Sequence, residues 1–480
     1  MEAERTGKPG PALTIIVIAI SIFMTNLDTS IVNIAMPAFT RIFHADTGEV
    51  SRVVLMYLLA TVSLLLVFGK LSDLKGPEKI FTLGYLVFTV SSGLCAFAPS
   101  IALLVLFRFL QGIGSAMLLA TWGAIAVKYL PMEIRGRAYG LVTVFGGVGM
   151  AIGAPVGGFL IKYLSWKWIF LINIPVGIAA LILIRLILNR KNDRREQQER
   201  FDFPGAVLSF FGILVLFTLL HTGQDFGWLT WKTALLFLTA AGCLTGLYYR
   251  ERKAVSPLLN IRILKNKKVL AGFATTVIVT MILMGFNFLF PFFFSFVRHL
   301  EPEKTGLLLM TFPIVTILVS PVSGYLCDKG SPRTVSLAAL FFILVSGMLF
   351  ATFGIQTSYY FVISAFLLFG IGLALFFTAN TALLMSHATP AVSGMFTALI
   401  SAVSYLGSAL GINFFELIFS FRFPQTGTAT AIASLPADLL TQGFFYASVF
   451  GIILAVTGII AVLISKEKNK PLTPSRTNGL

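Results

Sequence analysis

The sequence predicts an all-α integral membrane protein in which two related six-helix halves flank two inserted helices. Its 480 residues are 57% hydrophobic and only 12% charged, and the mean hydropathy is +0.89. A soluble protein of ordinary composition carries about 25% charged residues, so most of this surface must face lipid. Long apolar runs and an internal repeat support the same fold.

Fourteen apolar stretches are candidate membrane spans, because a helix needs roughly 20 apolar residues to cross a bilayer. The first follows a short polar segment and lacks a small-residue cleavage site, so we expect a retained helix and not a signal peptide. The spans are predicted at residues 12–36, 50–69, 79–98, 101–124, 137–163, 167–189, 204–222, 231–249, 269–297, 304–327, 334–354, 358–386, 392–421 and 441–464.

A glycine stripe in the fifth span predicts close helix packing. Glycines recur there at every fourth residue, so on a helix they form one groove that a second backbone can approach. Residues 393–415 match this span at a fixed offset of 258. The predicted packing residues are Gly149, Gly153, Pro155, Gly157, Gly158, Gly407 and Gly411.

A second match predicts that the chain consists of two copies of one half-protein. GKLSDLKGPEK at 69–79 resembles GYLCDKGSPR at 324–333, with an offset of 255 between the aligned positions. Spans one to six and nine to fourteen then form the two copies, and spans seven and eight are an insertion. The predicted divisions are an N-terminal bundle (1–189), basic loops with the inserted helices (190–268), a C-terminal bundle (269–465) and a cytoplasmic tail (466–480).

The basic residues predict the orientation of the chain. Twenty-six Lys and Arg are assigned to one side of the membrane and eight to the other. Basic residues are enriched in cytoplasmic loops, so both termini are expected in the cytoplasm. The charged segment 190–200 is interpreted as a solvated loop, with contact to anionic lipid as an alternative.

Five motifs lie in order on the predicted helices. They are LDTSIVNIAMP (27–37), GKLSDLKGPEK (69–79), RFLQGIG (108–114), GMAIGAPVGG (149–158) and WKWIFLINIP (166–175). With these motifs the chain resembles the major facilitator superfamily and, within it, the drug:proton antiporters with fourteen spanning helices. The resemblance implies a bacterial cytoplasmic-membrane transporter that exports amphipathic compounds in exchange for protons. The sequence departs from the family pattern at Arg52, Leu74, Pro77 and Ala154.

Asp28 is the first candidate for a proton-coupling or cationic-substrate site. It lies inside the first span, where a carboxylate costs about 3 kcal/mol at the bilayer centre. Burial disfavours the charged form of a carboxyl group, which helps it to exchange a proton near neutral pH. A structural hydrogen bond to Asn26 or to a neighbouring helix is the alternative.

Further polar residues in the spans extend this candidate site. Arg108, Gln111 and Ser115 follow one another at helical spacing and form one inward-facing stripe. Arg108 needs a partner because a guanidinium cannot lose its charge, and Asp28 is the expected one, in a proton relay or in a structural ion pair. Glu416 is a second protonation or substrate candidate, or else forms a surface pair with Arg422. Cavity lining and interhelical hydrogen bonding are both open for Asn33, Asn380, Thr381 and Gln111.

By the same resemblance, charged residues at the cytoplasmic ends would close an inner gate. Asp73 and Lys79 in the first copy and Asp328 and Arg333 in the second are placed in short loops, next to Gly69. Anchoring by the positive-inside rule would explain the cations but not the repeated aspartates. The glycine stripes would act as sliding contacts while the two halves rock around a central cavity. Most of the 46 phenylalanines are expected to face lipid or fill the bundles, and a few in span 269–297 to line that cavity.

Catalytic and cofactor motifs are not found in the sequence. The four histidines occur singly, there is no HExxH, GxSxG or Walker motif, and the three cysteines form no CxxC pair. We therefore expect no enzyme activity, no metal, no cofactor and no nucleic acid, and an ion gradient as the energy source. The expected partners are protons, a small amphipathic substrate and the lipid bilayer, around a monomer. A narrow-substrate exporter and a non-transporting scaffold or receptor are the alternatives.

Overall fold

The computed structural model describes residues 11–188, 203–226, 230–253, 266–386, 393–421 and 435–464. Within these ranges all regular elements are helices, one of them a π-helical turn. The predicted loop 190–200, the tail 466–480 and Arg422 lie outside the described residues. The all-α prediction is confirmed.

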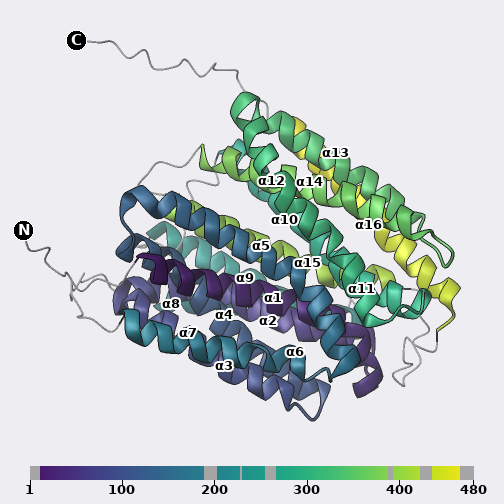
Figure 1. Ribbon diagram of the computed structural model, residues 1–480, viewed down its shortest axis with the longest axis horizontal. Coiled ribbons are helices and arrows are strands. Elements are labelled where there is room, and N and C mark those ends of the chain that lie inside the picture. Colours follow the sequence, from purple (N-terminus) through teal and green to yellow (C-terminus); the bar gives the residue numbers. More distant parts are fainter. Residues whose placement is uncertain are drawn as a thin grey trace, which may run out of the picture.

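Two helical bundles lie side by side, one made of the purple and blue helices and one of the green and yellow helices (Figure 1). The first contains α1 (Pro11–Phe43), α2 (Thr47–Lys75), α3 (Pro77–Ala96), α4 (Ile101–Tyr129), α5 (Met132–Tyr163), α6 (Trp168–Leu171) and α7 (Asn173–Leu188). The second contains α10 (Lys267–Phe292), η2 (Phe293–Val297), α11 (Pro302–Leu309), α12 (Thr311–Lys329), α13 (Pro332–Ala351), α14 (Tyr359–Met385), α15 (Ser393–Ser420) and α16 (Ala437–Ile464).

The two bundles repeat one packing pattern, which confirms the predicted duplication. In the first, α1 packs on α5, α2 on α4, and α3 on α4 and α7. In the second, α10 packs on α15, α12 on α14, and α13 on α14 and α16. His44 and His299, 255 positions apart, both have a positive φ (53° and 52°) directly after the first helix of their bundle. The same turn is therefore used twice.

The inserted helices form an antiparallel pair beside the first bundle. α8 (Phe203–Phe226) and α9 (Trp231–Lys253) pack on each other, with Gly212 facing Leu244 and Gly246 facing Leu208. α8 also contacts α2. In the described part of the chain, twelve helices are long and apolar enough to cross a membrane, and α8 and α9 occupy the two remaining predicted spans.

Several predicted helix limits differ from the structure, because glycine and proline residues set the ends and breaks of these helices. α2 continues to Lys75, and the chain turns at Gly76, whose φ of 89° suits glycine, before Pro77 opens α3. The sixth span is broken between α6 and α7. The ninth ends in η2 two residues after Pro291, whose missing N–H disturbs the regular hydrogen-bond ladder.

The glycine stripes hold the first helix of each bundle. A Cβ at Gly149 would lie 2.6 Å from the carbonyl oxygen of Phe23, and one at Gly153 would lie 2.5 Å from the Cβ of Ser30, both in α1. In the second bundle Gly407 and Gly411 face the backbone of α10 in the same way. These seams are therefore contacts within a bundle, where the sequence predicted sliding contacts. Gly157 faces Ile34 of α1, and Gly158 faces Pro302 of the other bundle.

Gly411→Val is expected to lower the free energy of unfolding by about 1–3 kcal/mol, the usual cost of overpacking. The added side chain would collide with the carbonyl oxygen of Met281, so α10 and α15 would have to separate. Thermal unfolding of the purified protein in detergent measures the effect. Gly324→Val is the matched control, because no atom lies within 4 Å of a Cβ placed there. Equal losses in the two variants would contradict the seam.

Three phenylalanines of α10 and η2 fill the second bundle, so the prediction that some phenylalanines of this span line a cavity was wrong for them. Phe286, Phe290 and Phe293 are at most 1% exposed. Their ring centroids lie 4.8 Å from Phe350, 4.8 Å from Phe366 and 4.6 Å from Phe444, respectively. Such contacts are typical of an aromatic core.

Candidate functional site

A buried polar cluster joins the helices of the first bundle around Asp28 of α1. Its Oδ2 accepts a hydrogen bond from Nη1 of Arg108 in α4 at 2.5 Å. Its Oδ1 accepts from Nε2 of Gln111 and from Nδ2 of Asn173, the first residue of α7, each at 2.9 Å. All four side chains are at most 1% exposed. The carboxylate thus has three donors and no contact with solvent.

Arg108 is held by groups from two further directions. Its Nε donates to the carbonyl oxygen of Val53 at 3.2 Å, and its Nη1 also donates to Oε1 of Gln111 at 2.6 Å. The guanidinium carbon lies 4.2 Å from the centre of the Tyr57 ring, a cation–π contact. The Tyr57 hydroxyl in turn donates to Ser115 at 2.9 Å. A buried charge needs this kind of compensation.

The chemistry of the pair is asymmetric. An arginine cannot release its proton inside a protein, whereas a carboxylate can bind one. A proton added to the Asp28 carboxylate would remove the counter-ion of Arg108, which stays charged.

The structure brings together Asp28, Arg108 and Gln111 as the sequence analysis expected. Asn26 is not part of the cluster, because its Nδ2 donates to the carbonyl oxygen of Ile22 at 3.0 Å. Asn33 lies apart from them, further along α1. It is 1% exposed, and neither polar atom of its side chain has a partner in the described parts of the chain.

Glu416 and Asn380 do not belong to the Asp28 cluster and form hydrogen bonds to other helices. Glu416 is 3% exposed and accepts from the Thr47 hydroxyl at 3.1 Å, so it links α15 to the start of α2 and is not a surface residue. Asn380 donates to Thr276 at 2.7 Å and to the carbonyl oxygen of Gly272 at 3.2 Å, which ties α14 to α10. Thr381, its neighbour, is exposed.

The four predicted gating charges lie in helix ends, so their placement in loops was wrong. Asp73 and Asp328 are in the last turns of α2 and α12, and Lys79 is exposed in the first turn of α3. Gly69 lies within α2. Arg333 donates to the carbonyl oxygens of Val462 and Leu463 at 3.2 and 2.8 Å. It therefore caps α16 of its own bundle, where a cation is favoured by the helix dipole.

Polar contacts between the bundles gather at the end where α1 and α5 finish, which we call the outer end after the predicted orientation. Nζ of Lys162 in α5 lies 2.9 Å from Glu301 and 2.6 Å from Glu303 of the second bundle. The hydrogen bond from Lys162 lowers the pKa of the Glu301 carboxyl. That contact therefore persists at neutral pH and is lost only as the pH falls through the lowered pKa.

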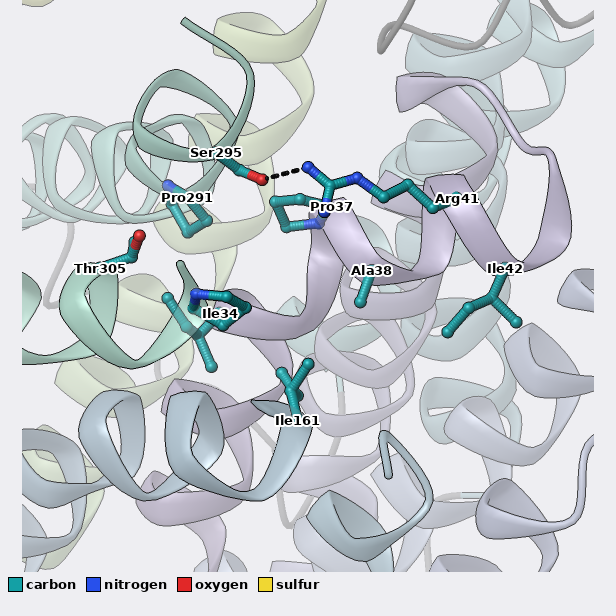
Figure 2. Close-up of a pocket in the computed structure, with 10 residues that line it drawn as sticks. Ile34, Pro37, Ala38, Arg41, Ile42, Ile161, Pro291, Ser295 and Thr305 are labelled. Atoms are coloured by element: carbon teal, nitrogen blue, oxygen red, sulfur yellow. Dashed lines mark hydrogen bonds between the residues drawn. The ribbon is translucent and has the colours of Figure 1, made fainter. Parts of the chain in front are cut away.

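A pocket of about 210 Å³ opens between the bundles at this end (Figure 2). Nη2 of Arg41 donates to Ser295 at 2.8 Å across it, and Pro37 and Pro291 line it from α1 and α10. Each pair is 254 positions apart, within one position of the 255-residue offset between the two copies. Most of the remaining lining is apolar, including Ile34.

The sequence analysis did not single out Asn173 as a functional residue. A signal was present, because Asn173 is the single amide or charged side chain between Lys167 and Arg185. A lone amide in an apolar span needs a partner. Tyr57 and Ser92 gave no such signal, since aromatic and small polar residues are common in membrane helices.

Comparisons with known proteins agree with this architecture. The family model described as Major Facilitator Superfamily matches residues 18–412 of the chain. The riboflavin transporter RibZ of Clostridioides difficile is 29% identical over 430 residues, covering 88% of this chain and 92% of the relative. The multidrug resistance protein Stp of Mycobacterium tuberculosis is 30% identical over 401 residues, covering 83% and 74%. The tetracenomycin C resistance and export protein of Streptomyces glaucescens is 28% identical over 417 residues, covering 87% and 77%.

A solved structure shares the fold. It is that of a bacterial homologue of the human lysosomal transporter Spinster, in an inward-facing and occupied conformation, with a TM-score of 0.67 and 12% sequence identity. The alignment covers 95% of this chain and 96% of that one. The twelve long apolar helices and the bacterial relatives indicate a multi-pass protein of the inner membrane. The chain belongs to the Major Facilitator Superfamily.

Proposed function

We propose that the chain is a proton-coupled antiporter that exports amphipathic or lipophilic compounds by alternating access, without catalysis or a cofactor. The observation that carries the proposal is the fully buried Asp28–Arg108 pair in the first bundle. A charged pair at this depth is costly, and in membrane proteins such residues mark ion and proton pathways. The relatives named for multidrug resistance and export support the substrate class.

α1 connects the proposed proton site to the contacts between the bundles. It carries Asp28 in its middle and, near its outer end, Arg41, which binds Ser295 of the second bundle. Protonation of Asp28 would loosen α1 from α4 and bias the outer contacts toward opening. Substrate would then leave at the outer end, past the mostly apolar pocket, with both termini in the cytoplasm and one chain sufficient for the cycle.

A second candidate is export or uptake of a single metabolite. It is favoured by the riboflavin transporter, which aligns over 92% of its own length. Both candidates share the fold, the cavity between the bundles and the proton site. They differ in how many unrelated compounds are moved.

The test is substrate-driven proton movement in proteoliposomes that enclose a pH-sensitive dye. A panel of lipophilic cations, neutral drugs and riboflavin is added one compound at a time. Proton movement with several unrelated compounds supports the multidrug antiporter, and a response to riboflavin alone supports the second candidate. A transported compound that moves no protons would refute the coupling.

Lys162→Gln is expected to shift the protein toward an open outer end. The change removes the cation that faces Glu301 and Glu303, so the ion pairs that join α5 to the second bundle are lost. Distances between spin labels at Phe97 and Ile355, which are 69% and 50% exposed, report the separation. The distribution should move to longer distances.

Arg298→Gln is the control for this experiment. Arg298 is also a cation at the outer end, but its guanidinium lies 4.7 Å from the Tyr359 ring of its own bundle. Its loss should leave the label distances unchanged. If Lys162→Gln gives the same distances as the parent protein, these ion pairs do not hold the outer end closed.

A further inference from the structure

Asp28 has two protonation states, and they need different neighbours. The carboxylate needs donors, and the structure supplies three. The protonated acid carries an O–H group, which needs an acceptor when it is buried. A missing partner would cost roughly 1–3 kcal/mol. The neighbours of Asp28 therefore decide how well the protonated state is tolerated.

Neither Arg108 nor Gln111 can supply that acceptor. Arginine has donors only. The orientation of Gln111 is fixed at both ends, because its Oε1 accepts from Arg108 and its Nε2 donates to Ser92 at 2.8 Å. The Ser92 hydroxyl donates to the carbonyl oxygen of Phe88 at 2.8 Å, so its oxygen can only accept from Gln111. Turning the Gln111 amide would place its Nε2 against the donor of Arg108 and its Oε1 against the Ser92 oxygen, so both hydrogen bonds would be lost.

Asn173 is free to turn. Its Nδ2 is bound to Asp28, while its Oδ1 is buried without a hydrogen-bond partner in the described part of the chain. The outer torsion of an asparagine side chain has a broad, roughly two-fold profile. A half-turn of the amide exchanges Nδ2 for Oδ1 beside Asp28 and breaks no other hydrogen bond of the side chain in the described structure.

The titratable groups near Asp28 do not provide the acceptor that Asn173 can provide. The Tyr57 hydroxyl donates a hydrogen bond to Ser115, and the Cys95 thiol donates to Oε1 of Gln111 at 3.8 Å. Charged residues on the other helices packed against α1 include Lys162 in α5, Arg185 in α7, Lys268 in α10 and Glu303 in α11, all in end turns, and Arg52 in the second turn of α2.

We propose that Asn173 is a positioning residue that follows the protonation of Asp28 by turning its amide. It donates through Nδ2 to the carboxylate and accepts through Oδ1 from the protonated acid. Asn173 opens α7 directly after the break in the sixth span, so the exchange also reaches a discontinuous span. This inference rests on the proposed function in one respect, namely that Asp28 takes up a proton.

Infrared difference spectra between low and high pH test the proposal on the full-length protein in lipid. The carbonyl band of protonated Asp28 is identified by its loss in Asp28→Asn. Asn173→Leu keeps the shape of the side chain but can neither donate nor accept. The Asp28 band should move to higher wavenumber in this variant, because the acid has lost its acceptor. Asn413→Leu, which replaces another buried asparagine, should leave the band in place.

A second measurement needs no change at position 173. In the parent protein with asparagine amides labelled with carbon-13, one amide carbonyl band should shift together with the Asp28 band as the pH is varied. An Asp28 band at the same wavenumber in Asn173→Leu, or no labelled band that follows the titration, would overturn the proposal. Neither measurement uses a substrate, so a failure of substrate-driven proton movement would count against the proposed function alone.

Discussion

Asp28→Asn is expected to reduce substrate-driven proton movement to the level of protein-free vesicles. The new side chain has nearly the same shape and can still accept from Arg108, but it cannot bind or release a proton. It resembles the protonated state permanently, because its amide group can donate to a turned Asn173. Substrate binding, measured in parallel on the detergent-solubilised protein, separates a loss of coupling from a loss of folding.

Asp46→Asn is the matched control for this prediction. Asp46 is an exposed carboxylate that caps α2 by accepting from the Glu49 amide at 2.7 Å. Asparagine caps a helix about as well as aspartate, so this variant also loses one carboxylate without losing structure. It should keep full proton movement. The proposal fails if Asp28→Asn retains the parental rate of substrate-driven proton movement.

The core of the candidate site was predictable because charges inside membrane spans have few possible partners. Asp28 and Arg108 are opposite charges at similar depth in two spans of the same copy, and neither can stay unpaired in lipid. The glycine stripe likewise predicted a close helix contact, and the offset between the copies predicted two bundles. These inferences follow from residue type and sequence position alone, because a charge inside a membrane span needs a partner and a row of glycines allows close approach of a backbone.

The neighbours that complete the site were not predictable in the same way. Asn173 has no charge, and its contact with Asp28 depends on the break that starts α7 at that residue. The partner of Glu416 is Thr47, which lies in the other bundle and 369 positions away. Such pairings follow from how the bundles dock, and that information is spread over the whole chain and not contained in a motif.

The glycine seams show a related limit. Four-residue spacing predicts that a backbone comes close, but it does not say which backbone. In the structure the partner is the first helix of the same bundle, so the seams fix α1 and α10 in place. Because α1 carries Asp28, the seam holds one side of this helix, and Arg108 of α4 and Asn173 of α7 contact Asp28 from other helices.

Arg108→Leu is expected to lower the free energy of unfolding by about 3–5 kcal/mol, the usual cost of removing one member of a buried ion pair. Asp28 would keep only the neutral donors Gln111 and Asn173, and the cation–π contact with Tyr57 would be lost. Thermal unfolding in detergent should show a large drop in the midpoint. Arg41→Leu is the control, because Arg41 is exposed and its loss removes one polar contact with Ser295.

The double variant with Asp28→Asn and Arg108→Leu separates stability from coupling. Both buried charges are then gone, so most of the stability lost in Arg108→Leu should return, because well-packed neutral residues can replace a buried pair. Proton movement should stay at background, since no titratable group remains at the site. Additive losses in the double variant would show that the two residues act independently. Recovered stability without recovered transport would instead show that the Asp28–Arg108 pair is needed for proton coupling and not for the stability of the fold.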